Sequence, residues 1–253
     1  MSNLAIVREV PASLPRALTG TPPDPPIDVA RARAQHVAYV DALVSIGLEV
    51  IRIPADEDYP DCPFVEDIAV VAGGTALVTR PGAPSRRGES PPVAMALAEQ
   101  AGLRLVHMEA PATLDGGDVL RLGDVFFVGA SSRSNAEGAA RLGEAFGARV
   151  VRVALPPRVL HLKSVCSPLA DDVVLVAEGT IPPETFAGAR VLVVPRAELP
   201  GANAVANGRA AIVPAGCARS RELVEAAGFR TVFVDNSELR KADSALTCLS
   251  ILV

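Results

Sequence analysis

Hydrophobic and polar positions follow a repeating plan along most of the chain. Two short apolar runs joined by a tight turn predict a hairpin of strands, and a polar loop with arginine then leads to a helix and a third strand. Copies of this plan begin near Asp67, Asp118, Ser164, Ala204 and Ser244. The resulting period of roughly 40 to 50 residues indicates an array of equivalent modules.

The final copy contains a single strand, so the other end of the chain has to complete it. A strand near 5–7, a helix near 29–46 and a strand near 48–51 supply the missing parts. Such closure removes free sheet edges. We therefore predict an α/β fold, a five-bladed α/β propeller of ββαβ modules with pseudo-five-fold symmetry, as one catalytic domain over 1–253. A doubly wound α/β sheet is the alternative, but it does not account for the hairpin before each helix.

Composition narrows the class of protein. Of the 253 residues, 49% are hydrophobic but only 4% are aromatic, so aliphatic residues must build the core. A net charge of −5 and a pI of about 5.3 argue against a nucleic-acid partner. Arg8 and Glu9 interrupt any N-terminal signal, and no apolar run reaches membrane-spanning length. These features predict a cytoplasmic protein with free thiols and no membrane partner.

Three residues far apart in the sequence suit nucleophilic catalysis by a thiol. Cys248 is the candidate nucleophile, His161 the candidate acid and base, and Asp115 the carboxylate that orients the histidine. Each lies at or just before the first strand of a module, so cyclic closure would bring them to one central pit. We expect the Cys248 thiol to be activated and to react first with iodoacetamide. Cys62, Cys166 and Cys217 are expected to be core residues.

Two charged groups predict the shape of a ligand. Asp61, Glu66 and Asp67 lead into a hydrophobic strand; one such acid alone would fit a solvated loop, but buried carboxylates need a cation, and a planar guanidinium satisfies them. Arg86 and Arg133 occupy the same slot in successive modules and suit an α-carboxylate. An arginine-like ligand fits both groups. A thiolate could attack its guanidinium carbon to form a thiouronium, which water would then hydrolyse.

Five ordered motifs resemble the dimethylarginine dimethylaminohydrolases of the pentein superfamily, whose fold is a five-bladed α/β propeller. They are Pro-Asp-Cys-Pro-Phe-Val-Glu-Asp at 60–67, with Tyr59 in place of the family's leading Leu, Arg-Pro-Gly-Ala-Pro-Ser-Arg-Arg at 80–87, Thr-Leu-Asp-Gly-Gly-Asp-Val-Leu at 113–120, Leu-His-Leu-Lys-Ser at 160–164 and Leu-Thr-Cys at 246–248. The resemblance implies hydrolysis of Nω-methylated arginines to citrulline and methylamine or dimethylamine. It assigns the catalytic roles to Cys248, His161 and Asp115.

The resemblance also implies further substrate-binding residues and a reaction without a cofactor. By motif position, Asp61, Glu66 and Asp67 would hold the guanidinium, and Arg86 and Arg133 the carboxylate. Leu18, within the Pro-rich stretch 15–26, would be the leucine of a lid, and the carbonyl of Ala242 would meet the α-amino group. No metal and no cofactor is expected, and the protein would be a monomer or homodimer.

Two rival functions remain open from the sequence. Another guanidino-modifying pentein, an arginine deiminase or an amidinotransferase, shares the chemistry up to the thiouronium. A non-catalytic pentein that binds a macromolecule would have no need for Cys248, His161 and Asp115 together. The role of Asp118, three residues after Asp115, is not decided by the pattern.

Overall fold

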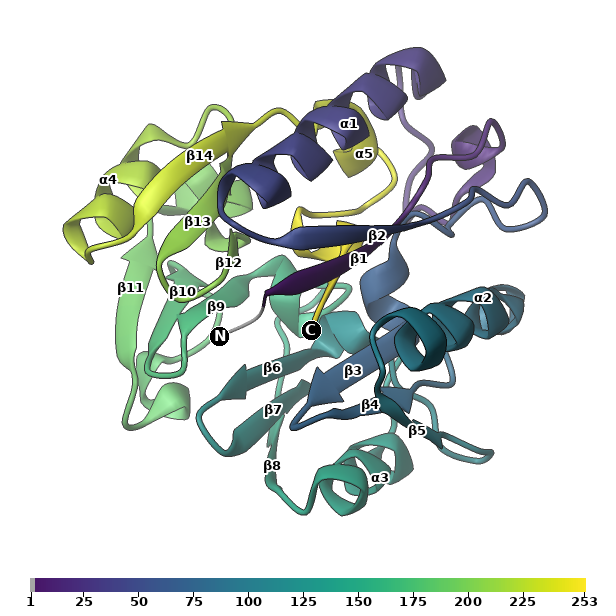
Figure 1. Ribbon diagram of the computed structural model, residues 1–253. Coiled ribbons are helices and arrows are strands. Elements are labelled where there is room, and N and C mark those ends of the chain that lie inside the picture. The colour runs from purple at the N-terminus through teal and green to yellow at the C-terminus, as the bar shows by residue number, and fades with distance from the viewer. Residues whose placement is uncertain (1–2) are drawn as a thin grey trace.

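The computed structural model describes residues 3–253, and within them the strands form five separate three-stranded sheets (Figure 1). In every sheet the first strand pairs antiparallel with the second, and the second pairs parallel with the third. The sheets are β15 (Ile251–Leu252), β1 (Leu4–Arg8) and β2 (Glu49–Ile53); β3 (Ala69–Ala72), β4 (Thr75–Val78) and β5 (Arg104–His107); β6 (Val119–Leu122), β7 (Val125–Gly129) and β8 (Arg149–Val153); β9 (Cys166–Ala170), β10 (Val173–Ala177) and β11 (Arg190–Val194); β12 (Val205–Ala206), β13 (Ala210–Pro214) and β14 (Arg230–Val234).

This topology confirms the five-module propeller and rules out a single doubly wound sheet. Residues from β3, β6, β9, β12 and β15 line one common cavity, so the first strands surround the axis of the molecule. The two ends of the chain share a sheet, as predicted, because Ala5 pairs with Leu252 and Ile6 with Ile251. The last strand begins at Ile251 rather than near Ser244, since a turn occupies the residues before it.

Helices connect the second strand of a module to the third. They are α1 (Val29–Ser45), α2 (Ser90–Met95), α3 (Ala136–Phe146) and α4 (Ala218–Ala226), whereas the short α5 (Ser237–Arg240) lies between β14 and β15. The Asp28 carboxylate caps α1 by accepting from Arg31 N–H, and Asn135 caps α3 through Gly138 N–H. The module of β9–β11 departs from the plan: β10 and β11 are connected only by a short 3₁₀ turn, Pro183–Phe186, which ends two residues before Gly188, where the φ of 95° is incompatible with a helix.

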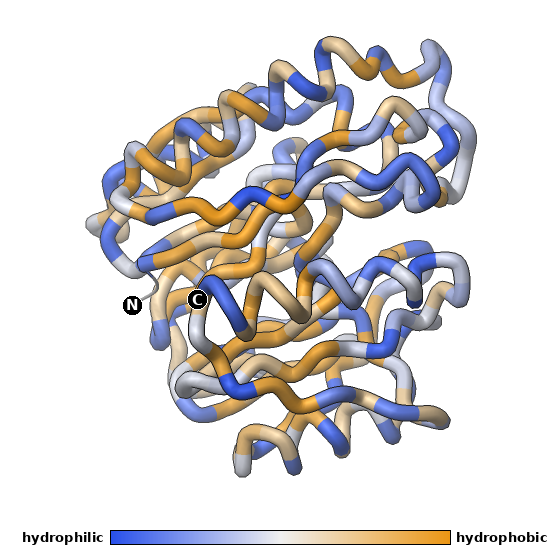
Figure 2. The backbone as a smooth tube through the Cα atoms, turned by 45° about the vertical axis from the view of Figure 1, so that its right-hand side comes forward, coloured by the Kyte–Doolittle hydropathy of each residue, from blue (hydrophilic) through white to orange (hydrophobic). Residues whose placement is uncertain are grey.

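The apolar core is divided among the interfaces between modules. Figure 2 shows hydrophobic stretches along the strands, interrupted by hydrophilic residues at the turns. One cluster joins three neighbouring modules through fully buried residues such as Leu120, Leu175 and Val213. A second packs Tyr39 and Leu43 of α1 against neighbouring sheets. No helix in residues 3–253 is long and apolar enough to cross a membrane.

A short 3₁₀ turn precedes the first strand of every module. These turns cover Val65–Ile68, Gly116–Asp118, Leu162–Ser164, Arg196–Ala202 and Thr247–Leu249. Because the first strands surround one axis, the turns that precede them meet at the same end of the propeller. The candidate catalytic residues lie in or beside these turns, so the fold alone brings distant parts of the sequence together.

Candidate active site

The turns enclose a small cavity of about 30 Å³ that contains most of the predicted site. Its lining residues come from the N-terminal segment and from every module except that of β12–β14. They are Leu18, Asp61, Phe64, Asp67, Arg86, Arg133, Leu160, His161, Ala242, Asp243, Ser244 and Cys248. Cys248 and His161 therefore share one cavity, as the sequence predicted. Asp115 lies behind His161, and Glu66 is not among the lining residues.

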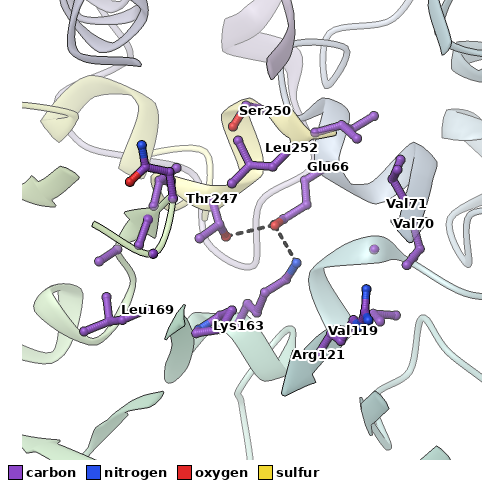
Figure 3. A pocket seen from close by; sticks show the side chains of 18 of the residues that line it. Glu66, Val70, Val71, Val119, Arg121, Lys163, Leu169, Thr247, Ser250 and Leu252 are labelled. Atoms are coloured by element: carbon purple, nitrogen blue, oxygen red, sulfur yellow. Dashed lines mark hydrogen bonds and ion pairs between the residues drawn. The ribbon is translucent and has the colours of Figure 1, made fainter. Parts of the chain in front are cut away.

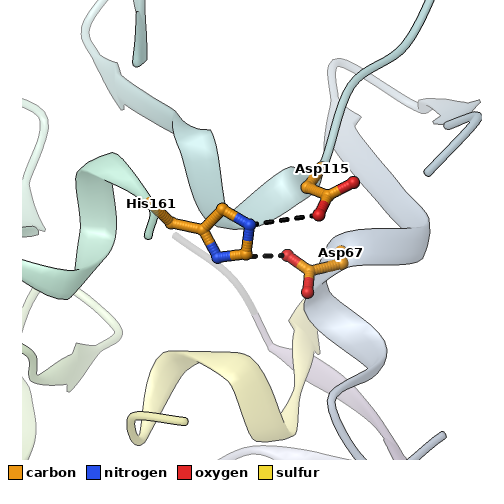
Figure 4. A group of neighbouring side chains, drawn as sticks. All are labelled: Asp67, Asp115 and His161. Carbon is orange, nitrogen blue, oxygen red and sulfur yellow. Dashed lines mark hydrogen bonds and ion pairs between the residues drawn. The ribbon is translucent and has the colours of Figure 1, made fainter. Parts of the chain in front are cut away.

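The His161 imidazole lies between two buried carboxylates (Figure 4). Its Nε2 is 3.1 Å from Asp115 Oδ2, and its Nδ1 is 4.0 Å from Asp67 Oδ1. Burial by itself lowers the pKa of this histidine, but the charge of Asp67 and the hydrogen bond to Asp115 outweigh it and raise the pKa to about 9. At neutral pH the ring is therefore an imidazolium with a proton to give.

Asp115 is fixed by contacts of its own. Its side chain is fully buried, and Oδ1 accepts a hydrogen bond from Gly82 N–H at 2.8 Å. Gly82 allows this close approach, because a Cβ at that position would lie 2.3 Å from the carbonyl oxygen of Arg133. The loop that carries Arg86 is thus pressed against the loop that carries Arg133, with Asp115 beneath both.

The structure gives Asp118 the role that the sequence left open. Its Oδ1 accepts the backbone N–H of Leu162, the residue after His161, at 3.1 Å. Its Oδ2 accepts the hydroxyl of Ser134 at 2.6 Å, and Ser134 Oγ in turn accepts the N–H of Asp115. Asp118 therefore connects the backbones of both members of the histidine–carboxylate pair.

Cys248 lies in the 3₁₀ turn before β15, and its Sγ accepts the backbone N–H of Ala245 at 3.4 Å. Burial and the nearby carboxylates of Glu66 and Asp67 raise the pKa of its thiol. The charge of Lys163 lowers that pKa, but by less than burial and the two acids raise it, so the expected activation of Cys248 would need the added positive charge of a bound ligand. The other cysteines are free and buried, and Cys248 alone is partly exposed.

The three acids Asp61, Glu66 and Asp67 lie in different places and have different partners. Asp67 Oδ2 pairs with Arg86 at 2.5 Å, while Asp67 Oδ1 accepts Gly117 N–H and faces His161. The Asp61 carboxylate accepts the backbone N–H of Leu18 at 3.1 Å, and burial raises its pKa. Glu66 points to the opposite side of the turn. We expected it on the guanidinium side, but its carboxylate is instead paired with Lys163 and bonded to Thr247, because adjacent residues of the turn face different cavities.

The two arginines also differ. Arg86 is buried, and its N–H groups donate to acceptors inside the protein. These are both carboxylate oxygens of Glu89 at 2.9–3.0 Å, the carbonyl of Phe64 at 2.9 Å and the carboxylate of Asp67. The Arg133 side chain is 20% exposed, and its nearest acid, Asp115, is 3.8 Å away. Arg133 thus presents the freer guanidinium. The role of Glu89 was not predicted, although its position three residues after Arg86 was a usable signal.

Among residues 3–253, Asp67, Asp115 and His161 form a group whose ligand atoms all lie within 4.8 Å of one another. Such a group could hold a metal ion, but its carboxylates already accept from Arg86 and from the N–H groups of Gly82 and Gly117. A metal would have to displace these donors. We therefore interpret the group as an acid–base cluster.

The segment around Leu18 covers the cavity from outside. Leu18 is 40% exposed, its N–H is bonded to Asp61, and the N–H of Gly20 is bonded to Asp243 Oδ2 at 2.6 Å. A cavity of about 30 Å³ has room for roughly one water molecule. An amino acid needs more room than this, so part of the lining would have to move to admit one.

The five modules and the cysteine, histidine and acids gathered at their axis define the class: the fold is that of a pentein, as in the guanidino-group-modifying enzymes. The family model described as N,N dimethylarginine dimethylhydrolase, eukaryotic, matches residues 25–197. The chain belongs to the dimethylarginine dimethylaminohydrolase family.

Individual relatives match over the whole chain. The N(G),N(G)-dimethylarginine dimethylaminohydrolase of Pseudomonas aeruginosa is 35% identical, over 97% of this chain and 98% of the relative. The enzyme of that name from Streptomyces coelicolor is 40% identical, over 99% and 96%. The solved structure of a cysteine-to-serine variant of the Pseudomonas enzyme, complexed with citrulline, superposes with a TM-score of 0.92 at 35% identity and covers both chains completely.

Proposed function

We propose that this chain hydrolyses Nω-methylated L-arginines, asymmetric dimethylarginine and monomethylarginine, to L-citrulline and dimethylamine or methylamine. The observation that carries the proposal is the cavity shared by Cys248 and a charged His161, with carboxylates and an accessible arginine in its walls. Membership of the family and the citrulline complex of the Pseudomonas relative support the same reaction. Residues 1–253 would act as one catalytic domain.

The walls of the cavity fit the two ends of such a substrate. Asp61 and Asp67 would bind the guanidinium, because both carboxylates line the cavity and are largely buried. Arg133 would bind the α-carboxylate with its freer guanidinium, and Arg86 would add a weaker contact while it holds Asp67. The carbonyl of Ala242 would accept from the α-amino group, and Leu18 would close over the bound ligand.

The first half of the reaction forms a covalent bond to sulfur. A bound guanidinium places positive charge beside a thiol whose pKa burial and two carboxylates hold high, so binding would favour release of the thiol proton to solvent, since His161 is already protonated. The thiolate then attacks the guanidinium carbon. The C–N bond to the methylated nitrogen breaks as His161 gives its proton to the leaving amine. His161 Nδ1 is the candidate donor atom, since Nε2 is occupied by Asp115.

The second half restores the enzyme. His161, now neutral, takes a proton from water as the water oxygen attacks the thiouronium carbon. The C–S bond then breaks, the thiolate of Cys248 leaves, and the ureido group of citrulline remains. Asp115 holds the imidazole in place and stabilises its cationic form in both halves.

Product analysis tests this proposal. The purified protein is incubated with asymmetric dimethylarginine, monomethylarginine and unmodified arginine in parallel, and citrulline, the methylamines and ammonia are quantified. We expect citrulline and dimethylamine in equal amounts from the first substrate and much slower release of ammonia from arginine. Faster turnover of arginine would instead identify an arginine deiminase. Transfer of the amidino group to an added amine would identify an amidinotransferase.

Two further properties are proposed from the same structure. The four cysteines are free, which supports a reducing, cytoplasmic location. The acidic pI supports a small-molecule substrate and no nucleic-acid partner, with a monomer or homodimer as the working form.

A further inference from the structure

Four buried or largely buried side chains form a continuous hydrogen-bonded chain beneath the catalytic cavity. Lys163 Nζ donates to Glu66 Oε1 at 2.5 Å, and Thr247 Oγ1 donates to Glu66 Oε2 at 2.8 Å (Figure 3). Asn203 Nδ2 completes the chain by donating to Thr247 Oγ1 at 3.0 Å. We call Glu66, Lys163, Asn203 and Thr247 the floor network. Each comes from a different module.

Three members of the floor network are sequence neighbours of proposed site residues. Glu66 directly precedes Asp67, Thr247 directly precedes Cys248, and Lys163 follows His161 by two residues. The network therefore acts on the backbone from which the reacting side chains extend.

Asn203 is the member without a catalytic neighbour, and its contacts all point to the other segments. Its Oδ1 accepts the backbone N–H of Thr247 at 3.0 Å. Its Nδ2 donates to the backbone carbonyl of Lys163 at 2.7 Å and to the Thr247 hydroxyl. A single planar amide thus bridges the segment that carries His161 and the turn that carries Cys248.

The position of Asn203 in the fold gives it no direct part in the reaction. Its side chain is 2% exposed, it does not line the catalytic cavity, and its module contributes no residue to that cavity. Yet it occupies the turn before β12, the place from which other modules present Asp67, His161 and Cys248. In this module, the residue at that position supports neighbouring segments and takes no direct part in the proposed reaction.

We infer that Asn203 is a positioning residue that fixes the distance between Cys248 and His161 by bridging Thr247 and Lys163. The inference rests on the proposed roles of Cys248 and His161. A covalent mechanism needs the sulfur, the guanidinium carbon and the imidazole in register, and a displacement of about 1 Å costs roughly 100-fold in rate. Loss of the bridge should therefore lower kcat, while substrate binding, which Asn203 does not touch, is largely preserved.

The chain offers a matched control four residues away. Asn207 also makes three side-chain hydrogen bonds, to Ile46 O, Arg209 N and Ala210 N, and none of them reaches the floor network. Asn207→Ala therefore removes the same group and the same number of bonds from the same module. Any difference between Asn203→Ala and Asn207→Ala reports position rather than general destabilisation.

The experiment compares wild type, Asn203→Ala, Asn203→Asp and Asn207→Ala at a temperature where circular dichroism shows all of them folded. The readouts are kcat and KM for asymmetric dimethylarginine and the rate of Cys248 alkylation by iodoacetamide, followed by peptide mass spectrometry. Asn203→Asp is the second variant in case Asn203→Ala does not fold, because it keeps the shape and the acceptor for Thr247 N–H but loses both donated bonds.

We expect both Asn203 variants to lose about 100-fold in kcat with KM changed by no more than about threefold. Their Cys248 should also be alkylated several-fold faster, because release of the turn exposes a thiol whose pKa burial holds high. Asn207→Ala should resemble wild type in both readouts. Equal kcat in the Asn203 and Asn207 variants, or an effect confined to KM, would overturn the inference.

Alkylation separates this inference from the proposed function. If Cys248→Ser retained full turnover, the catalytic assignment would fail. The bridge would still be tested by whether the Asn203 variants alter Cys248 alkylation while Asn207→Ala does not. Unchanged alkylation in all three variants would overturn the bridge by itself.

Discussion

Two cavities lie on opposite sides of the ring of turns, and they differ in size and in chemistry. The larger, of about 560 Å³, is surrounded by the first strands of the modules, and about half of its lining residues are aliphatic, such as Val70, Leu169 and Leu252. The smaller, of about 30 Å³, is crowded with buried charge. In this protein the concentration of buried ionisable groups, rather than the available volume, marks the place where chemistry is proposed.

The two cavities share their dividing wall. Glu66 and Thr247 line the larger one, while their immediate neighbours Asp67 and Cys248 line the smaller one. Consecutive residues in each turn thus serve different sides. The catalytic side is therefore held in place from behind, and variants on the two sides should have different effects.

The largest expected effect separates the reacting thiol from the structural ones. Cys248→Ser should lower kcat by about 10⁴-fold or more, since serine cannot supply a thiolate. Cys217→Ser is the control, because Cys217 is buried outside both cavities and should cost stability but not turnover. Steady-state assays of citrulline formation measure both. Retained activity in Cys248→Ser would remove the small cavity from the mechanism.

The next effect concerns the ion pair of Glu66 and Lys163 in the wall between the two cavities. Lys163→Met leaves the Glu66 carboxylate buried without its cation, which should cost about 3 to 5 kcal/mol of unfolding free energy. Urea denaturation of this variant should be compared with the double variant Glu66→Gln, Lys163→Met, which removes both charges and should recover much of the loss. Equal stability of the two would contradict the ion pair as the support of the wall.

A third test contrasts an arginine of each cavity. Arg133→Ala should raise KM for asymmetric dimethylarginine by about 100-fold with a smaller change in kcat, because the α-carboxylate is remote from the bond that breaks. Arg121→Ala, in the wall of the larger cavity, should leave both constants unchanged. Arg86→Ala should in addition destabilise the fold, since Asp67 and Glu89 would lose their shared partner. Equal KM values for Arg133→Ala and Arg121→Ala would refute the assignment.

The smallest effect is a shift in pH dependence. Burial lowers the pKa of His161 in the ligand-free protein, but Asp67 and Asp115 raise it to about 9, so the protonated acid persists to that pH and kcat/KM should fall above it. Asp115→Asn removes one of the carboxylates that favour the cation. The alkaline limb of kcat/KM should then move to lower pH by about 1 to 3 units. An unmoved limb would exclude His161 as the titrating acid.

Much of the fold could be predicted from the sequence because its signals are local. Alternating apolar runs, the hairpin turns at 171–172 and 207–208 and the helix at Ala136–Phe146 all depend on neighbouring residues. The missing helix between β10 and β11 was not anticipated, and Pro182 and Pro183 alone do not explain it, since α2 also has two prolines in its first turn. The approach of Cys248 to His161, with Asp115 behind the imidazole, followed from the cyclic order of the modules, without any local contact.

Only the tertiary structure decided which way each charged side chain points and what it meets. Glu66 and Asp67 are adjacent in the sequence, yet one stabilises the wall and the other faces His161. The raised pKa of the Cys248 thiol and the internal pairing of Arg86 depend on groups brought from other modules. The sequence determines residue types and their period, but charge interactions act through space, and the distances that govern them exist only once the ring has closed.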